Sequence, residues 1–171
     1  IKPLRGGSSK GISKLNELEE IPGAIAEVKK IDTHFILEKG VAGFEVGCGI
    51  LGNDLLFLGE VDEIELTAGF FDYTEKYQLN SSTIHMPARI SEPLKQEIRF
   101  QAERLYRLLG CSGLARIDFF ITHSGEVLLN EVNTLPGFTE HSRFPAMMTH
   151  NGLTYQQLVA RLIALALEEQ A

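Results

Sequence analysis

Two neighbouring apolar segments in the C-terminal half of the chain carry polar side chains of the kinds that bind magnesium. These side chains belong to Arg116, Asp118, Glu131 and Asn133. A hairpin turn at Ser124-Gly125 between the segments would place His123 opposite Glu126. In that register Asp118 lies opposite Glu131, and all four polar side chains share one face, because residues two apart point to the same side of a strand.

The predicted pairing sets two carboxylates directly opposite each other, with their Cβ atoms about 5 Å apart, where like charges repel. A divalent cation removes this conflict, and Asp118, Glu131 and Asn133 offer the hard oxygen ligands that Mg²⁺ prefers. Arg116 would then be a fixed cation beside the metal, suited to stabilising a developing negative charge. The alternative is a structural ladder in which Arg116 forms an ion pair with Asp118.

Two cationic segments could reach the phosphates of a nucleotide. Lys2 precedes the segment Arg5-Gly6-Gly7-Ser8-Ser9-Lys10-Gly11, whose backbone N–H groups could surround an anion. The segment is not a P-loop, because no Gly-Lys-Ser/Thr opens a helix. Residues 67–82 lack periodicity and carry a second cation, Lys76, which by itself is an ordinary surface lysine. Together with the hairpin, these segments predict a nucleotide held between layers and covered by a loop.

The periodicity of the chain predicts an α+β fold in which antiparallel strands are covered by helices. The predicted strands are 34–38, 43–51, 55–66, 83–86, 114–122 and 126–132. The predicted helices are 16–30 with Asn16 as N-cap, 91–109 with Ser91 as N-cap, 145–150 and 154–168. The apolar face of 91–109 is predicted to contain Ile98, Ala102, Leu105 and Leu109. We expect Asp62, Glu63 and Glu65 to form a solvated strand face.

Composition excludes several classes of protein. The chain has 171 residues and a formal net charge of −7, without a basic stripe, which argues against a surface for nucleic acid or anionic membranes. No apolar run approaches the ~20 residues that span a bilayer. Cys48 and Cys111 are expected to be free thiols in a reducing compartment. Because the chain opens at Ile1 in the middle of a pattern, we expect it to be part of a longer protein.

Five groups of residues occur in an order that matches one known family. They are Lys2-Pro3 with Arg5-Gly6-Gly7-Ser8-Ser9, Glu38-Lys39 with Gly43-Phe44-Glu45, Asp72-Tyr73-Thr74-Glu75-Lys76-Tyr77, Arg116-Ile117-Asp118, and Asn130-Glu131-Val132-Asn133-Thr134-Leu135-Pro136-Gly137-Phe138-Thr139 with His141-Ser142. In these motifs, over essentially its whole length, the chain resembles the D-alanine–D-alanine ligases of the ATP-grasp superfamily.

The resemblance implies roles for single residues. The implied ATP-binding residues are Lys2, Glu38, Lys39, Val41, Glu45 and Lys76. The implied catalytic residues are Ser8, Arg116, Lys76 and Tyr77. The implied metal ligands, for Mg²⁺ or Mn²⁺, are Asp118, Glu131 and Asn133, in agreement with the hairpin register. The implied site for the carboxylate of the second substrate is Ser142 with the backbone of Gly137.

The resemblance also implies an activity and a domain division. ATP would phosphorylate one D-alanine, and the amine of a second would attack the acyl phosphate, making a dipeptide for peptidoglycan. Residues 1–45 would end the central ATP-grasp subdomain and 46–171 would form the C-terminal domain, with the family's N-terminal domain absent from the chain. A cytoplasmic homodimer is implied, with D-alanine and ATP as partners and without nucleic acid or membrane.

Departures from the family pattern leave alternatives open. Glu140 stands where serine is frequent, and Val41 belongs to a hinge, Lys39-Gly40-Val41, without the usual aromatic residue at its middle position. The segment Glu75-Lys76-Tyr77 favours an amine as second substrate over D-lactate. D-serine stays open, because segments 62–66 and 70–73 also resemble D-Ala–D-Ser ligases of the vancomycin-resistance type. A nucleotide-binding module without catalysis is the alternative from another class, although the set Arg116, Asp118, Glu131 and Asn133 is complete.

Overall fold

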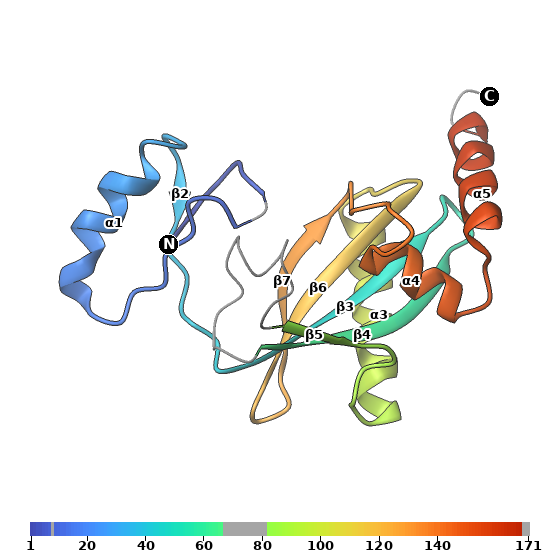
Figure 1. The fold of residues 1–171 in the computed structure, drawn as a ribbon, viewed down its shortest axis with the longest axis horizontal. Helices are drawn as coiled ribbons and strands as arrows, with labels where there is room; N and C mark the ends of the chain where they lie inside the picture. Colours follow the sequence, from blue (N-terminus) through green and yellow to red (C-terminus); the bar gives the residue numbers. More distant parts are fainter. Residues whose placement is uncertain (8, 67–81, 169–171) are drawn as a thin grey trace. The chain divides into compact units, whose positions relative to one another are not determined.

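The computed structural model of the chain describes residues 1–7, 9–66 and 82–168. These residues fall into two compact units, one built on Ile1–Ala42 and the other on Gly43–Glu65 with Ile84–Ala171 (Figure 1). The predicted site residues occur in both units, and each unit is described on its own. The assignment of 1–45 and 46–171 to two ATP-grasp subdomains stays a prediction.

The first unit pairs two short strands beside one helix. Strand β1 (Lys2–Pro3) is antiparallel to β2 (Phe35–Ile36), and a 3₁₀ turn, η1 (Leu18–Glu20), leads into α1 (Ile21–Val28). The helix is shorter than predicted, because the Glu20 carboxylate accepts the backbone N–H groups of Asn16 and Glu17 and holds that segment in a tighter turn. These two hydrogen bonds lower the pKa of Glu20. Pro22 lies in the first turn of α1, where its missing N–H costs nothing.

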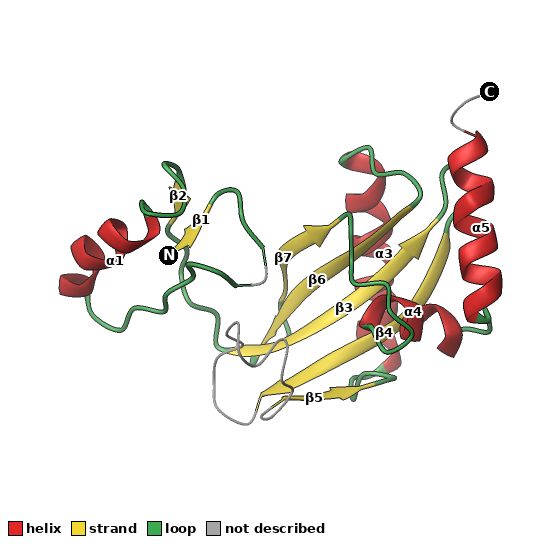
Figure 2. Cartoon of the chain, turned by 45° about the horizontal axis from the view of Figure 1, so that its top comes forward, coloured by secondary structure: helices red, strands yellow, loops and turns green. Residues whose placement is uncertain are grey.

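The second unit is built on a five-stranded sheet with the order β5-β4-β3-β6-β7 (Figure 2). The strands are β3 (Gly43–Leu51), β4 (Phe57–Leu66), β5 (Ser82–His85), β6 (Leu114–Thr122) and β7 (Val127–Asn133). The pairs β3–β4, β3–β6 and β6–β7 are antiparallel, which confirms the predicted α+β class. Central strand β3 is buried from Val46 onward.

Helices pack on both faces of this sheet. On one face, Ile98, Ala102 and Tyr106 of α3 (Glu92–Leu108) join a core with Val46 and Ile117. On the other face lie α4 (Arg143–His150) and then α5 (Tyr155–Glu168), whose apolar side chains form a second cluster with Leu51. Because α4 covers the face opposite to α3, its first residues reach the polar rows of the sheet.

The buried face of α3 differs from the prediction at its C-terminal end. Tyr106 is buried and its hydroxyl donates to the carbonyl of Gly52 at 2.7 Å, whereas Leu109 is 57% exposed. Leu109 lies beyond the last helical residue, so it no longer follows the 3.6-residue period that brings side chains to the core.

Both cysteines are free, and burial raises the pKa of the Cys48 thiol to about 12.

Candidate active site

A row of polar residues crosses four strands of the sheet in the second unit. Glu131 on β7 is opposite Asp118 on β6, Asp118 is opposite Gly47 on β3, and Gly47 is opposite Asp62 on β4. Arg116 and Asn133 are opposite each other in the next row of the same face. The predicted pairing of the four hairpin residues is therefore confirmed.

The hairpin reaches this register by a route that the sequence analysis did not foresee. At the turn, the Thr122 N–H donates to the Glu126 carbonyl, so Glu126 faces Thr122 and not His123. Phe119 pairs with Leu129 while Asp118 pairs with Glu131, so Asn130 is an extra residue in β7. This β-bulge restores the pairing at the site, because one inserted residue offsets the one-residue shift at the turn.

Arg116 and Asp118 form a close ion pair. The Arg116 Nε lies 2.8 Å from Oδ1 and 3.0 Å from Oδ2 of Asp118, and Nη2 lies 2.7 Å from Oδ2. The Asp118 side chain is 1% exposed. This is the contact of the ladder alternative, and it also holds a guanidinium beside the carboxylates. A metal on Asp118 would have to share an oxygen with Arg116.

Arg143, at the start of α4, is the residue that the sequence analysis missed. Its Nε and Nη2 each lie 2.7 Å from an oxygen of Asp62, and its guanidinium also lies 3.4 Å from Glu45 and from Asp118. Although burial lowers the pKa of Arg143, the charges of Asp62 and Asp118 raise it well above its ordinary value. One signal was present: a cation in the first turn of a helix opposes the helix dipole, so it needs a specific anionic partner.

Asp62 and Glu63 of β4 are buried in ion pairs, so the expected solvated face is wrong for these two, whereas Glu65 is exposed as expected. Asp62 is 0% exposed and Glu63 is 6% exposed. Burial raises the pKa of Glu63, but the hydrogen bonds that Arg89 donates lower it by more, so the net shift is downward. Glu65 bonds His85 at 2.7 Å, which lowers the Glu65 pKa. Partners far along the chain, rather than solvent, compensate these charges.

Gly47 makes room for the buried ion pairs. A Cβ atom here would lie 2.5 Å from Nη2 of Arg143, 2.7 Å from Oδ1 of Asp118 and 2.9 Å from Oδ1 of Asp62. These distances are too short for any real contact, and the surrounding groups are held by their ion pairs. Glycine is therefore required at the centre of the row.

Substitution Gly47→Ala is expected to lower the free energy of unfolding by about 1–3 kcal/mol, the usual cost of overpacking. Denaturant titration followed by circular dichroism measures it. Gly40→Ala is the control, since no described atom lies within 4 Å of a Cβ built there. Equal unfolding free energies for the two variants would contradict the assigned packing.

The remaining predicted residues of the second unit lie on or beside this face. The Glu131 carboxylate is exposed and forms no ion pair with another described residue. The Asn133 Oδ1 accepts the Leu135 N–H at 3.1 Å and keeps a second lone pair. Ser142 is the N-cap of α4 and its hydroxyl bonds Thr139, while a Cβ built on Gly137 would lie 3.1 Å from that hydroxyl. Gly137 and Ser142 are thus brought together.

The predicted nucleotide residues of the first unit are partly brought together. The Lys2 ammonium lies 2.9 Å from the Glu38 carboxylate, across the β1–β2 pair. Lys39 is exposed and Val41 is half-buried. The remaining predicted residues, Ser8, Lys76 and Tyr77, lie outside the described residues.

Two observations test whether the residues fit a nucleotide and its metal. No described atom lies within 4 Å of a Cβ built on Gly7, and its backbone is not left-handed, so packing and turn geometry do not require glycine there. A ligand that approaches the backbone at this position would require glycine. No group of three or more His, Cys, Asp or Glu side chains among the described residues is arranged so that it could hold a metal ion, yet the hairpin supplies two carboxylates and an amide oxygen, which suit Mg²⁺. The donor set fits a magnesium nucleotide.

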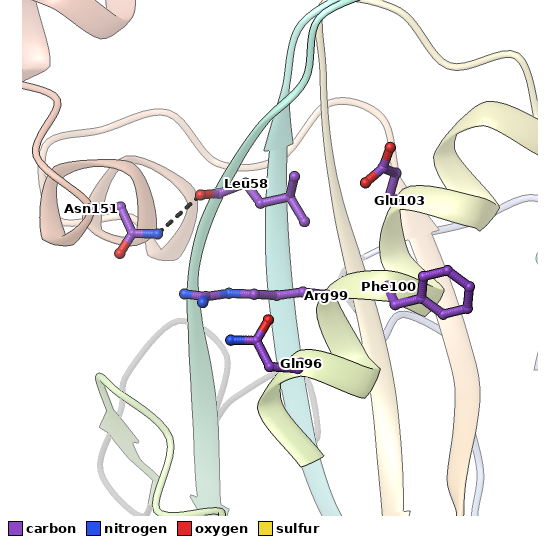
Figure 3. A pocket seen from close by; sticks show the side chains of 6 residues that line it. All are labelled: Leu58, Gln96, Arg99, Phe100, Glu103 and Asn151. Atoms are coloured by element: carbon purple, nitrogen blue, oxygen red, sulfur yellow. Dashed lines mark hydrogen bonds between the residues drawn. The ribbon is translucent and has the colours of Figure 1, made fainter. Parts of the chain in front are cut away.

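A cavity of about 390 Å³ lies away from this row, between α3, β4 and the end of α4 (Figure 3). Arg99 crosses it beside Gln96, and Asn151 donates to the Leu58 carbonyl at 3.0 Å. None of the predicted site residues lines this cavity. Arg99 pairs with Glu60 at 3.1 Å, so the main charge here is compensated within the protein.

Comparison with known proteins decides the family. The family described as "D-ala D-ala ligase C-terminus" matches residues 1–164. The chain belongs to this ligase family. Its fold is accordingly the C-terminal part of the ATP-grasp fold, as the resemblance predicted.

Three similar proteins show which members of the family this chain resembles. The vancomycin C-type resistance protein VanC2 of Enterococcus casseliflavus is 54% identical over 99% of this chain and 48% of its own. The crystal structure of the VanG D-Ala:D-Ser ligase from Enterococcus faecalis is 54% identical, with a TM-score of 0.87 over 96% of this chain and 48% of that one. A D-alanine–D-alanine ligase of Prosthecochloris aestuarii is 41% identical over 99% of this chain and 47% of its own. This chain therefore spans about half the length of these relatives.

No helix in the described residues is both long and apolar enough to cross a membrane.

Proposed function

We propose that this chain supplies the C-terminal half of an ATP-dependent, ADP-forming ligase that joins D-alanine to D-serine. The observation that carries the proposal is the 54% identity to a D-Ala:D-Ser ligase along almost the whole chain, against 41% to a D-alanine–D-alanine ligase. The sequence analysis ranked D-alanine first as acceptor. The comparisons support its alternative, D-serine, better. A cytoplasmic enzyme of peptidoglycan synthesis fits either acceptor.

The residues that the resemblance implies for the metal and the nucleotide are given the following roles. Asp118, Glu131 and Asn133 would hold Mg²⁺, and Lys2 with the glycine segment would hold phosphates. Glu38, Lys39 and Val41 would contact adenine, and Glu45 would accept a hydrogen bond from a ribose hydroxyl. When bound, the magnesium nucleotide supplies the phosphoryl group that activates the carboxylate of the first D-alanine.

The residues of the chain position and neutralise charge, which is most of what phosphoryl transfer requires. Arg116, held beside Asp118, donates to the oxyanion that forms when the acceptor amine attacks. Ser142 donates its hydroxyl to the acceptor carboxylate, with the backbone of Gly137 close by. Lys76 and Tyr77, which lie outside the described residues, stay predicted catalytic residues.

A competition experiment tests the proposed acceptor. The protein at its full native length is given ATP, Mg²⁺ and D-alanine with equal D-serine and D-lactate, and the products are separated by mass. We expect D-Ala–D-Ser to predominate. Predominant D-Ala–D-Ala would restore the other acceptor within the same ligase class, and nucleotide binding without any product would favour the module without catalysis.

Tyr155 of α5 holds the segment that carries Gly137. Its hydroxyl donates to the Phe138 carbonyl at 2.8 Å, and the rings of Tyr155 and Phe138 lie 5.8 Å apart. Tyr155→Phe keeps the ring and removes the hydrogen bond. We expect the KM for the acceptor to rise about three- to tenfold, the effect of losing one such bond, while the KM for ATP stays unchanged. Equal changes in both KM values would point to a general loss of folding instead.

A further inference from the structure

Asp32 connects the glycine segment to the strand that leads toward Glu38. Its carboxylate accepts the Arg5 backbone N–H at 2.8 Å and the Arg5 side chain at 2.9 Å through Nη2 and at 3.3 Å through Nε. It also accepts the His34 backbone N–H at 3.0 Å. Arg5 directly precedes Gly6, and His34 directly precedes β2. One carboxylate thus holds both segments.

The Asp32 carboxylate ends the hydrogen-bond ladder between β1 and β2. Lys2 pairs with Ile36 and Pro3 with Phe35, and the Leu4 N–H donates to the His34 carbonyl at 2.9 Å. In a continued ladder the His34 N–H would donate back to the Leu4 carbonyl, but Asp32 Oδ1 accepts it, and Asp32 Oδ2 accepts the N–H that follows Leu4, that of Arg5. A side chain that takes the place of the ladder ends the strand pairing at a fixed residue, so the direction in which the chain enters Gly6 is set by Asp32.

The charges of this pair also suit an anion-binding segment. Asp32 is 7% exposed, whereas the Arg5 side chain is 72% exposed. The hydrogen bonds from Arg5 hold the pKa of Asp32 well below its usual range, and they raise the pKa of Arg5. A bare carboxylate at the entrance to a phosphate segment would repel the ligand. Paired with Arg5 it is neutralised, and it anchors the backbone without opposing phosphate.

We propose that Asp32 is a positioning residue for nucleotide phosphates, acting through Arg5 on the backbone of Gly6 and Gly7. The inference rests on the proposed nucleotide binding, and it adds a residue that contacts neither the metal ligands nor the acceptor site. Arg5 is then an anchor of the segment rather than a phosphate ligand.

Binding of two probes separates this role from a purely structural one. Mg²⁺–ATP and adenosine are titrated calorimetrically into the protein at its full native length and into Asp32→Asn. Asparagine turns an NH₂ group toward donors that need an acceptor, so the segment loses its anchor. We expect affinity for ATP to fall at least about tenfold, the effect of losing one charged hydrogen bond, while affinity for adenosine, which has no phosphate, is unchanged.

A second variant and a control complete the test. Arg5→Gln alters an exposed side chain, so this variant should fold normally. It should weaken the binding of ATP and leave the binding of adenosine unchanged. Glu27→Gln removes an exposed ion pair with Lys30 in the same unit and should change neither probe. Unchanged or stronger ATP binding by Asp32→Asn, or equal losses for ATP and adenosine, would overturn the inference. Failure of the unaltered protein to bind either probe would instead refute the proposed function.

Discussion

Replacement of Arg143 by leucine is expected to lower the free energy of unfolding by about 3–5 kcal/mol, the cost of removing one partner from a buried ion pair. The Arg143 side chain is 11% exposed, and its guanidinium lies between Asp62 and Asp118, whose side chains are 0% and 1% exposed. Without it, Asp62 would lose its bidentate partner in the interior of the sheet. Denaturant titration of the unaltered chain and the variant measures the difference.

Two further variants identify the cause of the loss in Arg143→Leu. Arg107→Leu removes an exposed ion pair with Glu103 on α3, and it should cost no more than about 1 kcal/mol. Adding Asp62→Asn to Arg143→Leu removes the uncompensated charge and should recover part of the stability. If Arg143→Leu were no less stable than Arg107→Leu, the buried network would not contribute to folding in the way its geometry indicates.

Glu131→Gln is expected to lower the rate of ADP release at limiting Mg²⁺ on the order of 10–100-fold, the range found when even the outer partners of a metal ligand are changed. Glu131 is exposed and forms no ion pair among the described residues, so its substitution should leave the unfolding free energy unchanged. The expected loss is therefore separable from any loss of stability. Steady-state assays across a Mg²⁺ series measure it.

The dependence on Mg²⁺ distinguishes a metal ligand from a residue that acts otherwise. Excess Mg²⁺ should restore part of the activity of Glu131→Gln, because the remaining ligands still bind metal weakly. Glu126→Gln, in the exposed turn of the same hairpin, is the matched control. Full activity of Glu131→Gln at limiting Mg²⁺ would remove Glu131 from the ligand set and return the hairpin to the structural-ladder interpretation.

Local patterns in the sequence predicted the strands and their polar face well. Alternation and turn residues located β3 and β6 at their observed bounds, and two-residue periodicity placed Asp118 and Glu131 on one face. The register at the turn was predicted with an error of one residue. The bulge at Asn130 corrected the register, and periodicity alone cannot reveal a bulge, because it interrupts the period that the prediction assumes.

Contacts between distant residues were outside the reach of the sequence analysis. Arg143 lies 81 positions from Asp62, and Asp32 lies 27 positions from Arg5. No local period links such pairs, and only the folded sheet or the β1–β2 ladder brings them together. This is also why Asp62 and Glu63 were mistaken for surface acids, since their sequence context is identical whether solvent or an arginine faces them.

The polar face of the sheet also has a charge balance of its own. Among the described residues, the guanidinium groups of Arg116 and Arg143 share this face with the carboxylates of Glu45, Asp62, Asp118 and Glu131. Glu131 differs from the other three, because its carboxylate is exposed and forms no ion pair with another described residue. Under the proposed function, a divalent cation would therefore meet one carboxylate that no arginine of the described residues engages, beside carboxylates whose charge the arginines already offset.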